Sequence, residues 1–556
     1  MTPARPEPPP AAPPAWPHCG HRSGPDDPAG CRGARVAGHG ACLAHLDETD
    51  RAAHLASLSP GDDVDHRGTP FTEDLLNRLL DALRDPGTGR PLMGTARFDE
   101  ASFAGTAWFN RASFSGEAWF AGAVFAGDAR FGGARFLGDA WFAGAVFSGD
   151  AWFDGAALAG ADFADASLSG DVWLDRVTLT GDLRLDRARF EGASHLGPLV
   201  CGRTVSLDRA VFGVPVTVEV AARRMSCVRT RWQSTATLRL RHAELDLTDA
   251  IFEYPVAVAA RSAPFSRSWG DPLPESPLAG RDPGVRLTSV SGIDAAHLVL
   301  QDVDLGGCRF AGAVHLDQLR VDGWCTFGST PAGSRRWSPR RTLAEEHHWR
   351  ARTGRTPART RGWTPPPDGV SVLQPAALAA LYRQIRKSLE DGKNEPDAAD
   401  FYYGEMEMRR HDTTRPRGER ALLAAYWALS GYGLRATRAL GWLLGAMTAT
   451  VLALMLWGLP AEVPRPTTTG RQVASGQTLT LVTDTPDPRN PAGPWSGRLT
   501  AERFEKALRV VINSVVFRSS GQDLTTAGTY TEMASRFAEP ALLGLAVLAV
   551  RSRVKR

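Results

Sequence analysis

Three cysteines and one histidine lie close together near the start of the chain: Cys19, Cys31, Cys42 and His45. Three thiolates and one imidazole are a ligand set that closes the tetrahedral shell of a structural Zn²⁺. Cys42 and His45 are three positions apart, so one turn can present both side chains. The segment is rich in glycine and proline and has no apolar core, so a metal ion would supply its folding energy. We therefore expect residues 16–60 to form a zinc-ribbon-like module with a structural zinc ion.

Two alternatives to this ligand set stay open. His18, His21 and His39 are rival ligands, and the segment could instead be a disordered leader with incidental cysteines, because only one closely spaced pair is present. The chain has seven cysteines in total, and their odd number and wide scatter argue against a disulfide framework. Residues 1–15 are proline-rich without an apolar stretch, which predicts a disordered leader, no cleaved signal peptide and a reducing, cytosolic setting.

A helix is expected directly after this module, within residues 61–93. Thr72 is the predicted N-cap, and Pro86-Gly87 is the predicted stop. Five leucines fall on one face of this helix: Leu75, Leu76, Leu79, Leu80 and Leu83. We expect the helix to cap the open end of a solenoid, since an uncapped end would expose apolar side chains and free strand edges.

The solenoid is indicated by a large apolar residue that recurs, mostly at alternating steps of five and six, from Phe98 to Phe190. An alanine stands two places before most of these residues, as in FAGAVFSGDAWF (142–153). Neither the helical period of 3.6 nor a long alternating strand gives this spacing. A chain that turns a corner about every five residues does, because the large residue and the small one two places earlier then both point inward.

This A-x-F/L pattern resembles the pentapeptide-repeat family, whose members form a right-handed, four-sided β-helix. The resemblance implies a mainly β fold, a right-handed quadrilateral β-helix over residues 94–328 with roughly ten coils. Residues 261–284 carry no repeat phase and are interpreted as a loop inserted into the solenoid. The six-residue steps, often filled by Gly-Asp or Gly-Glu, match a divergent, bacterial, membrane-anchored branch of the family.

A basic linker and two helices are expected after the repeats. Residues 329–372 include nine arginines between positions 335 and 361, which could hold RNA, contact anionic lipid or remain solvated. The adjacent pairs Glu345-Glu346 and His347-His348 are not interpreted as a metal site, because neighbouring positions on a helix face apart. Residues 373–412 predict a helical hairpin that rests on the last coil.

One membrane crossing is predicted at residues 436–461, and a second is considered at 533–551. The segment 439–461 has 23 uncharged residues, enough to cross a bilayer core of about 30 Å. Trp442 and Trp457 suit the two interfacial belts, and Arg435 and Arg438 place the preceding end, with the whole β-helix, in the cytoplasm. Residues 462–506 would then form an extracytoplasmic loop.

Between the two crossings, residues 507–530 loosely resemble the pore helix and filter of two-helix ion-channel modules. A potassium filter needs a Gly-Tyr-Gly run, whereas this chain has Gly528-Thr529-Tyr530. We therefore interpret the segment as an amphipathic or re-entrant helix.

No arrangement of histidine, serine, cysteine or carboxylate residues matches a catalytic motif, so a non-enzymatic function is expected. The preferred hypothesis is a scaffold at the cell membrane that presents its β-helix to a protein partner and contacts the lipid bilayer. The net charge of +3 implies no nucleic-acid partner. One alternative is a DNA-mimic inhibitor of a type II topoisomerase, which the family resemblance suggests; residues 98–175 hold three arginines and eleven acids, a net charge of 3 − 11 = −8. The other alternative is a channel-like or mechanosensory membrane protein.

Overall fold

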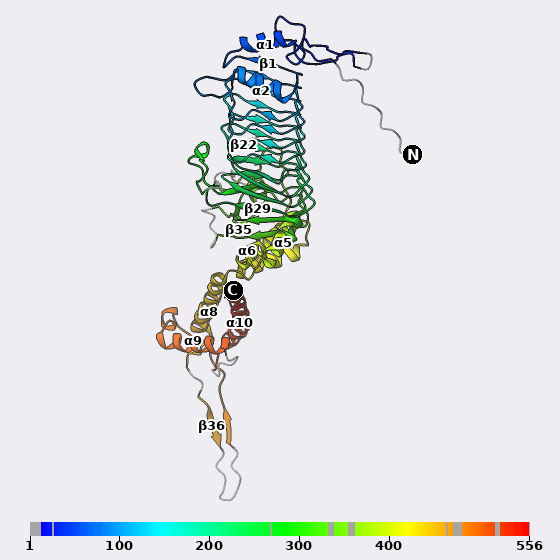
Figure 1. Ribbon diagram of the computed structural model, residues 1–556. Coiled ribbons are helices and arrows are strands. Elements are labelled where there is room, and N and C mark those ends of the chain that lie inside the picture. The colour runs from blue at the N-terminus through cyan, green and yellow to red at the C-terminus, as the bar shows by residue number, and fades with distance from the viewer. Residues whose placement is uncertain are drawn as a thin grey trace, which may run out of the picture. The chain divides into compact units, whose positions relative to one another are not determined.

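Short parallel strands stacked coil upon coil form a solenoid between Val64 and Asp322 (Figure 1). The structure is a computed structural model that describes residues 13–24, 27–266, 270–331, 339–353, 362–462, 465–470, 481–516 and 523–554. The chain divides into two units, Met1–Phe401 and Tyr402–Arg556. The first unit holds a β-solenoid of about 11 turns, as the repeat pattern predicts. The leader up to residue 12 and residues 332–338 and 354–361 of the basic linker lie outside the described residues.

Each coil of the solenoid has four sides, which we number as faces 1 to 4 in chain order. Face 1 contains β1 (Val64–Asp65), β4 (Ala96–Arg97), β8 (Ala118–Trp119), β12 (Ala140–Trp141), β16 (Ala161–Asp162) and β20 (Leu183–Arg184). Face 2 contains β2 (Pro70–Phe71), β5 (Ser102–Phe103), β9 (Val124–Phe125), β13 (Val146–Phe147), β17 (Ser167–Leu168), β21 (Arg189–Phe190), β23 (Val211–Phe212), β25 (Arg231–Trp232) and β28 (Ile251–Phe252). Face 3 contains β6 (Ala107–Trp108), β10 (Ala129–Arg130), β14 (Ala151–Trp152) and β18 (Val172–Trp173). Face 4 contains β3 (Leu92–Met93), β7 (Ser113–Phe114), β11 (Arg135–Phe136), β15 (Ala157–Leu158) and β19 (Thr178–Leu179).

The six-residue steps in the sequence set the length of a coil. Ala96 pairs with Ala118 and Ala118 pairs with Ala140, so one turn takes 22 residues. The extra residues, often Gly-Asp, lie at the corners that precede faces 1 and 3. Further along, Phe212 pairs with Trp232, so the turn has shortened to 20 residues. Several strands in this region are longer than those of the earlier coils: β22 (His195–Ser206), β24 (Val216–Ser226), β26 (Ala236–Arg241), β27 (Glu244–Asp246) and β29 (Val256–Ala260).

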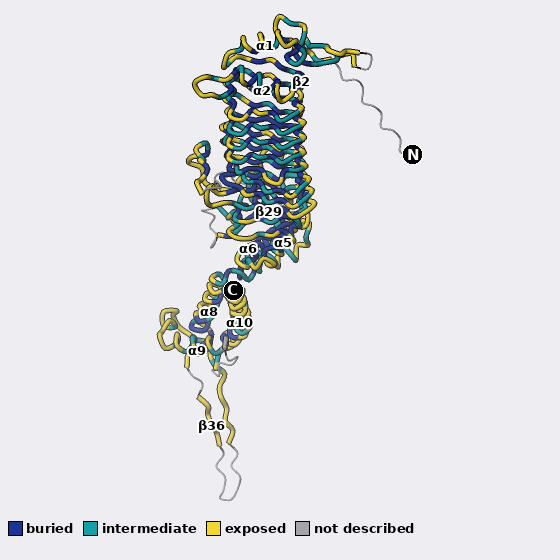
Figure 2. The backbone as a smooth tube through the Cα atoms, viewed as in Figure 1, coloured by how far each residue is buried: buried dark blue, intermediate teal, exposed yellow. Residues whose placement is uncertain are grey.

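The interior of the solenoid is filled by columns of stacked phenylalanines. Figure 2 shows the buried stretches of backbone that recur along the coils. On face 3 the ring centroids of Phe109 and Phe131 are 4.9 Å apart, and so are those of Phe131 and Phe153. The alanines two places earlier have no exposed surface, for example Ala107 and Ala129. A larger side chain at these positions would collide with the rings, which explains the alternation of small and large residues.

The first coil begins before the predicted helix. β1 and β2 precede α2 (Glu73–Ala82), and they pair with β4 and β5, so parallel pairing starts at Val64 rather than at residue 94. Thr72 is the N-cap of α2, as expected, and accepts a hydrogen bond from the Leu75 backbone N–H. Because α2 lies between β2 and β3 and packs against β6, the helix takes the place of face 3 in this coil.

The inserted loop is held against the side of the solenoid. The guanidinium of Arg241 donates two hydrogen bonds to Glu275, at 2.7 and 2.9 Å, and His242 Nε2 lies 3.0 Å from the same carboxylate. Phe265, Leu273 and Leu278, the last in η1 (Ser276–Leu278), are buried against the β22–β24 region. The insertion is therefore packed onto the strands that precede it.

Irregular coils and helices end the first unit. The last coils contain β30 (Val285–Ser289), η2 (Ala295–His297), β31 (Leu298–Gln301), β32 (Val303–Asp304), η3 (Leu316–Gln318) and β33 (Arg320–Asp322), followed by the β34–β35 pair (Gly328–Ser329, Arg341–Thr342). Helices α3 (Ala344–Thr353) and α5 (Pro375–Asp391) pack on these coils, and α6 (Glu395–His411) follows. Glu345 accepts hydrogen bonds from the backbone N–H groups of Phe310 and Ala311, at 2.5 and 2.9 Å. Part of the expected linker is thus an ordered end cap.

The second unit is mainly helical. It contains α7 (Arg417–Ser430), α8 (Ala436–Ala453) with a π-helical end η4 (Leu454–Gly458), the β36–β37 hairpin (Thr467–Gly470, Leu481–Asp484), η5 (Trp495–Arg498), α9 (Ala501–Val516) and α10 (Thr526–Val554). Residues 436–458 and 526–551 are long and apolar enough to cross a membrane, by length and composition alone. Residues 528–530 lie in the first turns of α10, where carbonyls bond along the helix axis. These residues therefore do not form a filter of the channel type.

Candidate metal centre and outer walls

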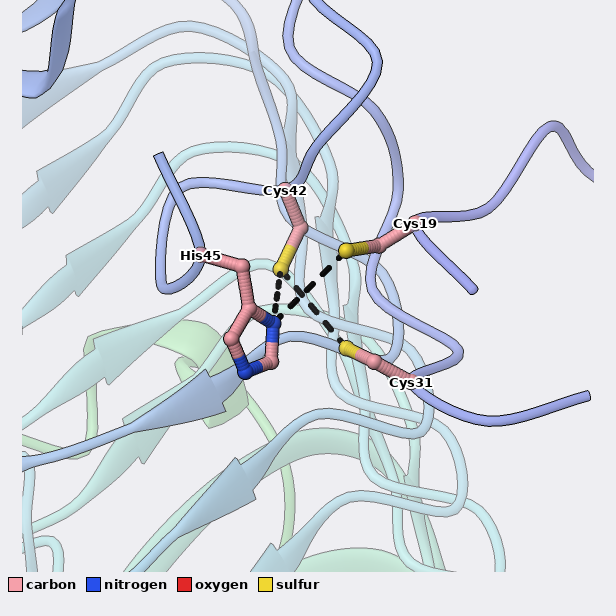
Figure 3. Close-up of side chains that lie close together, drawn as sticks. All are labelled: Cys19, Cys31, Cys42 and His45. Carbon is pink, nitrogen blue, oxygen red and sulfur yellow. Dashed lines mark hydrogen bonds between the residues drawn. The ribbon is translucent and has the colours of Figure 1, made fainter. Parts of the chain in front are cut away.

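The four candidate ligands converge at one point of the N-terminal segment (Figure 3). Their ligand atoms all lie within 4.8 Å of one another. His45 Nδ1 is 3.4 Å from Cys42 Sγ and 3.6 Å from Cys19 Sγ, and Cys31 Sγ is 3.7 Å from Cys42 Sγ. All four residues are at least half-buried, and Cys42 has no exposed surface. The cluster could hold one metal ion, and its donor set is compatible with zinc.

Two local structures bring the ligands together. Cys19 and Cys31 lie on facing backbone segments, where Cys19 N–H donates to Gly33 O and Gly20 N–H donates to Cys31 O, both at 2.8 Å. Cys42 and His45 lie on one turn, in which His45 N–H donates to Cys42 O at 2.9 Å. This turn leads into α1 (Glu48–Ser57), so a hairpin and a helix start each supply two ligands.

Gly33 shows that the cluster is closely fitted. A β-carbon at this position would lie 2.6 Å from Cys42 Cβ and 2.7 Å from Cys42 Sγ. The Gly33 N–H also points to Cys31 Sγ, at 3.4 Å, which stabilises negative charge on that sulfur. Backbone N–H donation to a thiolate is a supporting contact of the kind that metal ligands have, so the residues present fit the ion.

The electrostatics of the cluster favour a cation. Burial, with the nearby charges of Cys31 and Cys19, raises the pKa of Cys42 to about 12, and burial also raises the pKa of Cys31. Burial lowers the pKa of His45, which keeps its imidazole neutral. Three thiolates in this small space repel one another, and a divalent ion would compensate them, whereas a neutral imidazole is the form that ligates metals.

The rival histidines are engaged elsewhere. His21 stacks on the His45 ring, with centroids 4.2 Å apart, while His39 Nδ1 lies 3.3 Å from an Asp50 carboxylate oxygen. His18 Nδ1 is 3.4 Å from the Trp16 carbonyl. Sequence reasoning missed one supporting residue, Arg51, whose guanidinium donates to the carbonyls of Leu43, Ala44 and Leu46 and so fixes the ligand turn. Its position in the first turn of α1, three residues after Glu48, is the signal that could have indicated this role.

A second candidate site is the outer surface of the solenoid. Each strand of face 3 has one outward-pointing residue, which lies between the inward alanine or valine and the inward large residue. These outward residues form a column that we call the Trp wall: Trp108, Arg130, Trp152 and Trp173. The Arg130 guanidinium lies 4.9 Å from the Trp108 ring centroid and 5.1 Å from that of Trp152. Trp152 stacks on Trp173 at 4.8 Å. Face 1, on the opposite side, has a shorter column in which Trp119 stacks on Trp141 at 5.1 Å.

The comparison with protein families agrees with this architecture. Three overlapping stretches, residues 91–135, 109–157 and 131–178, match the family described as "Pentapeptide repeats (9 copies)". Residues 91–178 therefore match pentapeptide repeats, and the four-sided solenoid is the fold that these residues build. The search of curated proteins and the search of solved structures each gave no match.

Proposed function

We propose that this chain is a non-enzymatic, membrane-anchored scaffold whose cytoplasmic β-helix binds a protein partner along its outer wall. The observation that carries this proposal is the Trp wall. Tryptophan and arginine are enriched among the residues that dominate binding energy at protein interfaces. Such residues rarely stand in an ordered column on the outside of a protein without a partner to cover them.

The Trp wall is also preorganised for binding. Arg130 is held between two indoles and by an ion pair with Asp128, at 2.9 Å. Trp108 is 39% exposed, and its Nε1 donates to Glu73 at 2.8 Å, which fixes the ring orientation. Side chains that are already ordered lose little conformational entropy on association. A rigid aromatic column therefore supports a protein-binding function.

The wall is tested with the full-length protein in detergent as bait. We expect a partner protein that is retained by the wild type and by Leu137→Ser, an exposed position off the wall, but lost with the double variant Trp108→Ser and Trp173→Ser. Far-UV circular dichroism checks that the double variant keeps its β structure. If all three baits retain the same proteins, the wall is not the binding surface.

Membrane anchoring is supported by apolar side chains on the outside of α8 and α10. Leu444 is 67% exposed, and Phe537 is 83% exposed. In water these faces would be unfavourable, whereas lipid tails would cover them. Arg435 directly precedes α8 and Arg438 lies in its first turn, which by the positive-inside rule supports a cytoplasmic β-helix with residues 462–506 outside.

The orientation has its own test. A cysteine introduced at Thr468 in intact cells should react with a membrane-impermeant maleimide, whereas one at Arg417 should react only after lysis. The reverse pattern would overturn the orientation, and extraction of the chain by alkaline carbonate would overturn the anchoring.

We further propose that the Cys19, Cys31, Cys42 and His45 cluster binds Zn²⁺ as a structural ion. Four protein ligands leave no open position for substrate or water, which supports a folding role rather than a catalytic one. Inhibition of a type II topoisomerase remains the competing function for the acidic repeats. A DNA-supercoiling assay with the purified chain distinguishes the two, because a scaffold without DNA mimicry leaves supercoiling unchanged.

A further inference from the structure

A carboxyl group is buried halfway along the second candidate span. Glu539 lies at the midpoint of residues 526–551, and it has no exposed surface. At 1.5 Å per residue, either end of the span is about 20 Å away. An ionisable group at such a depth in a bilayer is costly and is therefore rarely without a function.

The partner of Glu539 is a hydroxyl on the other span. Thr450 Oγ1, in α8, lies 2.8 Å from Glu539 Oε1 and 3.0 Å from the Ala446 carbonyl of its own helix. A hydroxyl has one hydrogen, and a carbonyl can only accept. When Thr450 donates to Ala446, the contact with Glu539 is a hydrogen bond only if the carboxyl carries a proton. The neutral acid thus satisfies both contacts, whereas a carboxylate satisfies one at the expense of the other.

The charged groups nearby provide no compensation for a carboxylate. On α10, Arg536 is paired with Glu532 at 2.8 Å. On α8, Arg438 donates to the Trp427 carbonyl, three turns from Thr450. From the α9 side, Arg503 donates to the carbonyls of Met455 and Leu459. The remaining charged residues of the packed helices belong to their ends or to other ion pairs: Arg417, Glu419, Arg420, Glu502, Glu505, Lys506, Arg509 and Arg551. Within the part of the chain that the structure describes, Glu539 Oε2 has no hydrogen-bond partner.

We propose that Glu539 is a proton-binding site inside the membrane, held as a neutral acid that joins α8 and α10 through Thr450. The inference rests on the proposed membrane insertion. A hard metal cation would fit this site less well than a proton, because such cations bind about six oxygen atoms. Glu539, Thr450 and Ala446 bring a carboxyl, a hydroxyl and a carbonyl to the site. Loss of the proton would bury a charge and break the link between the helices.

Dicyclohexylcarbodiimide, which partitions into lipid, tests this protonation. A protonated carboxyl adds its oxygen to the central carbon of the reagent while its proton moves to a nitrogen. The acyl group then shifts from the oxygen to the other, unprotonated nitrogen, and the stable N-acylurea keeps every atom of both reactants. We expect the full chain in liposomes at pH 7.5 to be labelled at Glu539, identified by peptide mass spectrometry, with Glu532 unlabelled because its carboxylate is paired with Arg536. Labelling should fall as the pH is raised.

Matched variants and conditions decide each outcome. Glu539→Gln should lose the label but keep the wild-type melting temperature, because an amide can still donate to Thr450, whereas Glu539→Leu should melt lower. If sodium chloride protected Glu539 from labelling and choline chloride did not, the site would bind a metal cation rather than a proton, and the proposal would be overturned. If the chain resists carbonate extraction but Glu539 is not labelled, only the proton-site inference is overturned. If carbonate extracts the chain from the membrane, the proposed membrane anchoring itself is overturned.

Discussion

Gly33 and Cys42 approach each other so closely that a β-carbon on residue 33 would lie 2.6 Å from Cys42 Cβ. The glycine is therefore part of the candidate metal centre although it supplies no ligand atom. Both the ligands and this close approach lead to a prediction about zinc.

We expect the purified chain to contain about one zinc per molecule, measured by plasma mass spectrometry, since three cysteines and one histidine close a single tetrahedral shell. Cys42→Ser should lose the zinc, and Gly33→Ala should lose most of it because the new methyl group displaces the thiol. Gly40→Ala is the matched control, because nothing lies within 4 Å of its added carbon. Equal zinc in Gly33→Ala and Gly40→Ala would contradict the close-fitting site, and no zinc in the wild type would contradict the centre itself.

Removal of one phenylalanine from the interior should be strongly destabilising. Phe142 has no exposed surface and stacks between Phe120 and Phe163, at 5.0 and 4.7 Å. Phe142→Ala is expected to cost about 3–5 kcal/mol, because the rigid coils on both sides cannot collapse into the cavity. Leu137→Ala, at a side chain that is 70% exposed, should change stability by less than about 0.5 kcal/mol. Denaturant unfolding followed by tryptophan fluorescence measures both, and equal midpoints would argue against a packed interior.

The inserted loop should detach when Glu275 is neutralised. Burial raises the pKa of Glu275, but the hydrogen bonds from Arg241 and His242 outweigh it, so the pKa lies below its ordinary value of 4.5. A lowered pKa means that the stabilisation is complete above about pH 5 and is lost as the pH falls through the folded-state value. The melting temperature of the wild type should therefore exceed that of Glu275→Gln at neutral pH, and the difference should shrink toward pH 3.

Protease sensitivity gives the same loop an independent readout. At neutral pH, trypsin should cut Glu275→Gln faster at Arg281 than it cuts the wild type or Glu253→Gln, an exposed control. Identical cleavage in all three proteins would show that the contact with Arg241 does not hold the loop.

The end cap depends on Glu346, which has no exposed surface. It accepts two hydrogen bonds from Arg340, at 2.5 and 2.7 Å, and one from Tyr382, at 2.5 Å. Burial opposes ionisation, but Arg340 and Arg350 lower the pKa of Glu346 to about 2. Glu346→Gln leaves the Arg340 charge buried and uncompensated, so we expect a loss of about 3–5 kcal/mol in unfolding free energy. Glu390→Gln, which removes the exposed pair with Arg386, should cost less than about 1 kcal/mol.

The inward residues of the solenoid and the ligand cluster could be predicted from the sequence, because both are short-range patterns. An alanine two places before Phe109 or Phe120 is enough to identify both residues as inward-facing positions of a coil. Cys42 and His45 are likewise related by one turn. The small inward position also extends to Cys308, which has no exposed surface. At the last coil the pattern weakens, and Val321 is only half-buried.

Features that depend on distant partners could not be predicted in this way. Val64 and Phe71 enter the first coil without an A-x-F motif, since only their pairing with β4 and β5 places them there. The sequence gives only a reason not to interpret Glu345 and Glu346 as a metal site, whereas contacts with other segments bury both side chains. The contact between Arg241 and Glu275 likewise has no periodic signal. The Trp wall was not predicted either, although its residues lie inside the repeat, between the two inward positions.

Between Ala96 and Ala140 each turn takes 22 residues, so this part of the solenoid has a fixed unit of length. Duplication or deletion of one such unit there would leave every remaining ring above its former neighbour. The rod would grow or shrink in increments of about 4.8 Å. The length of the solenoid along its axis can therefore change in whole coils, without any change in the residues at either end.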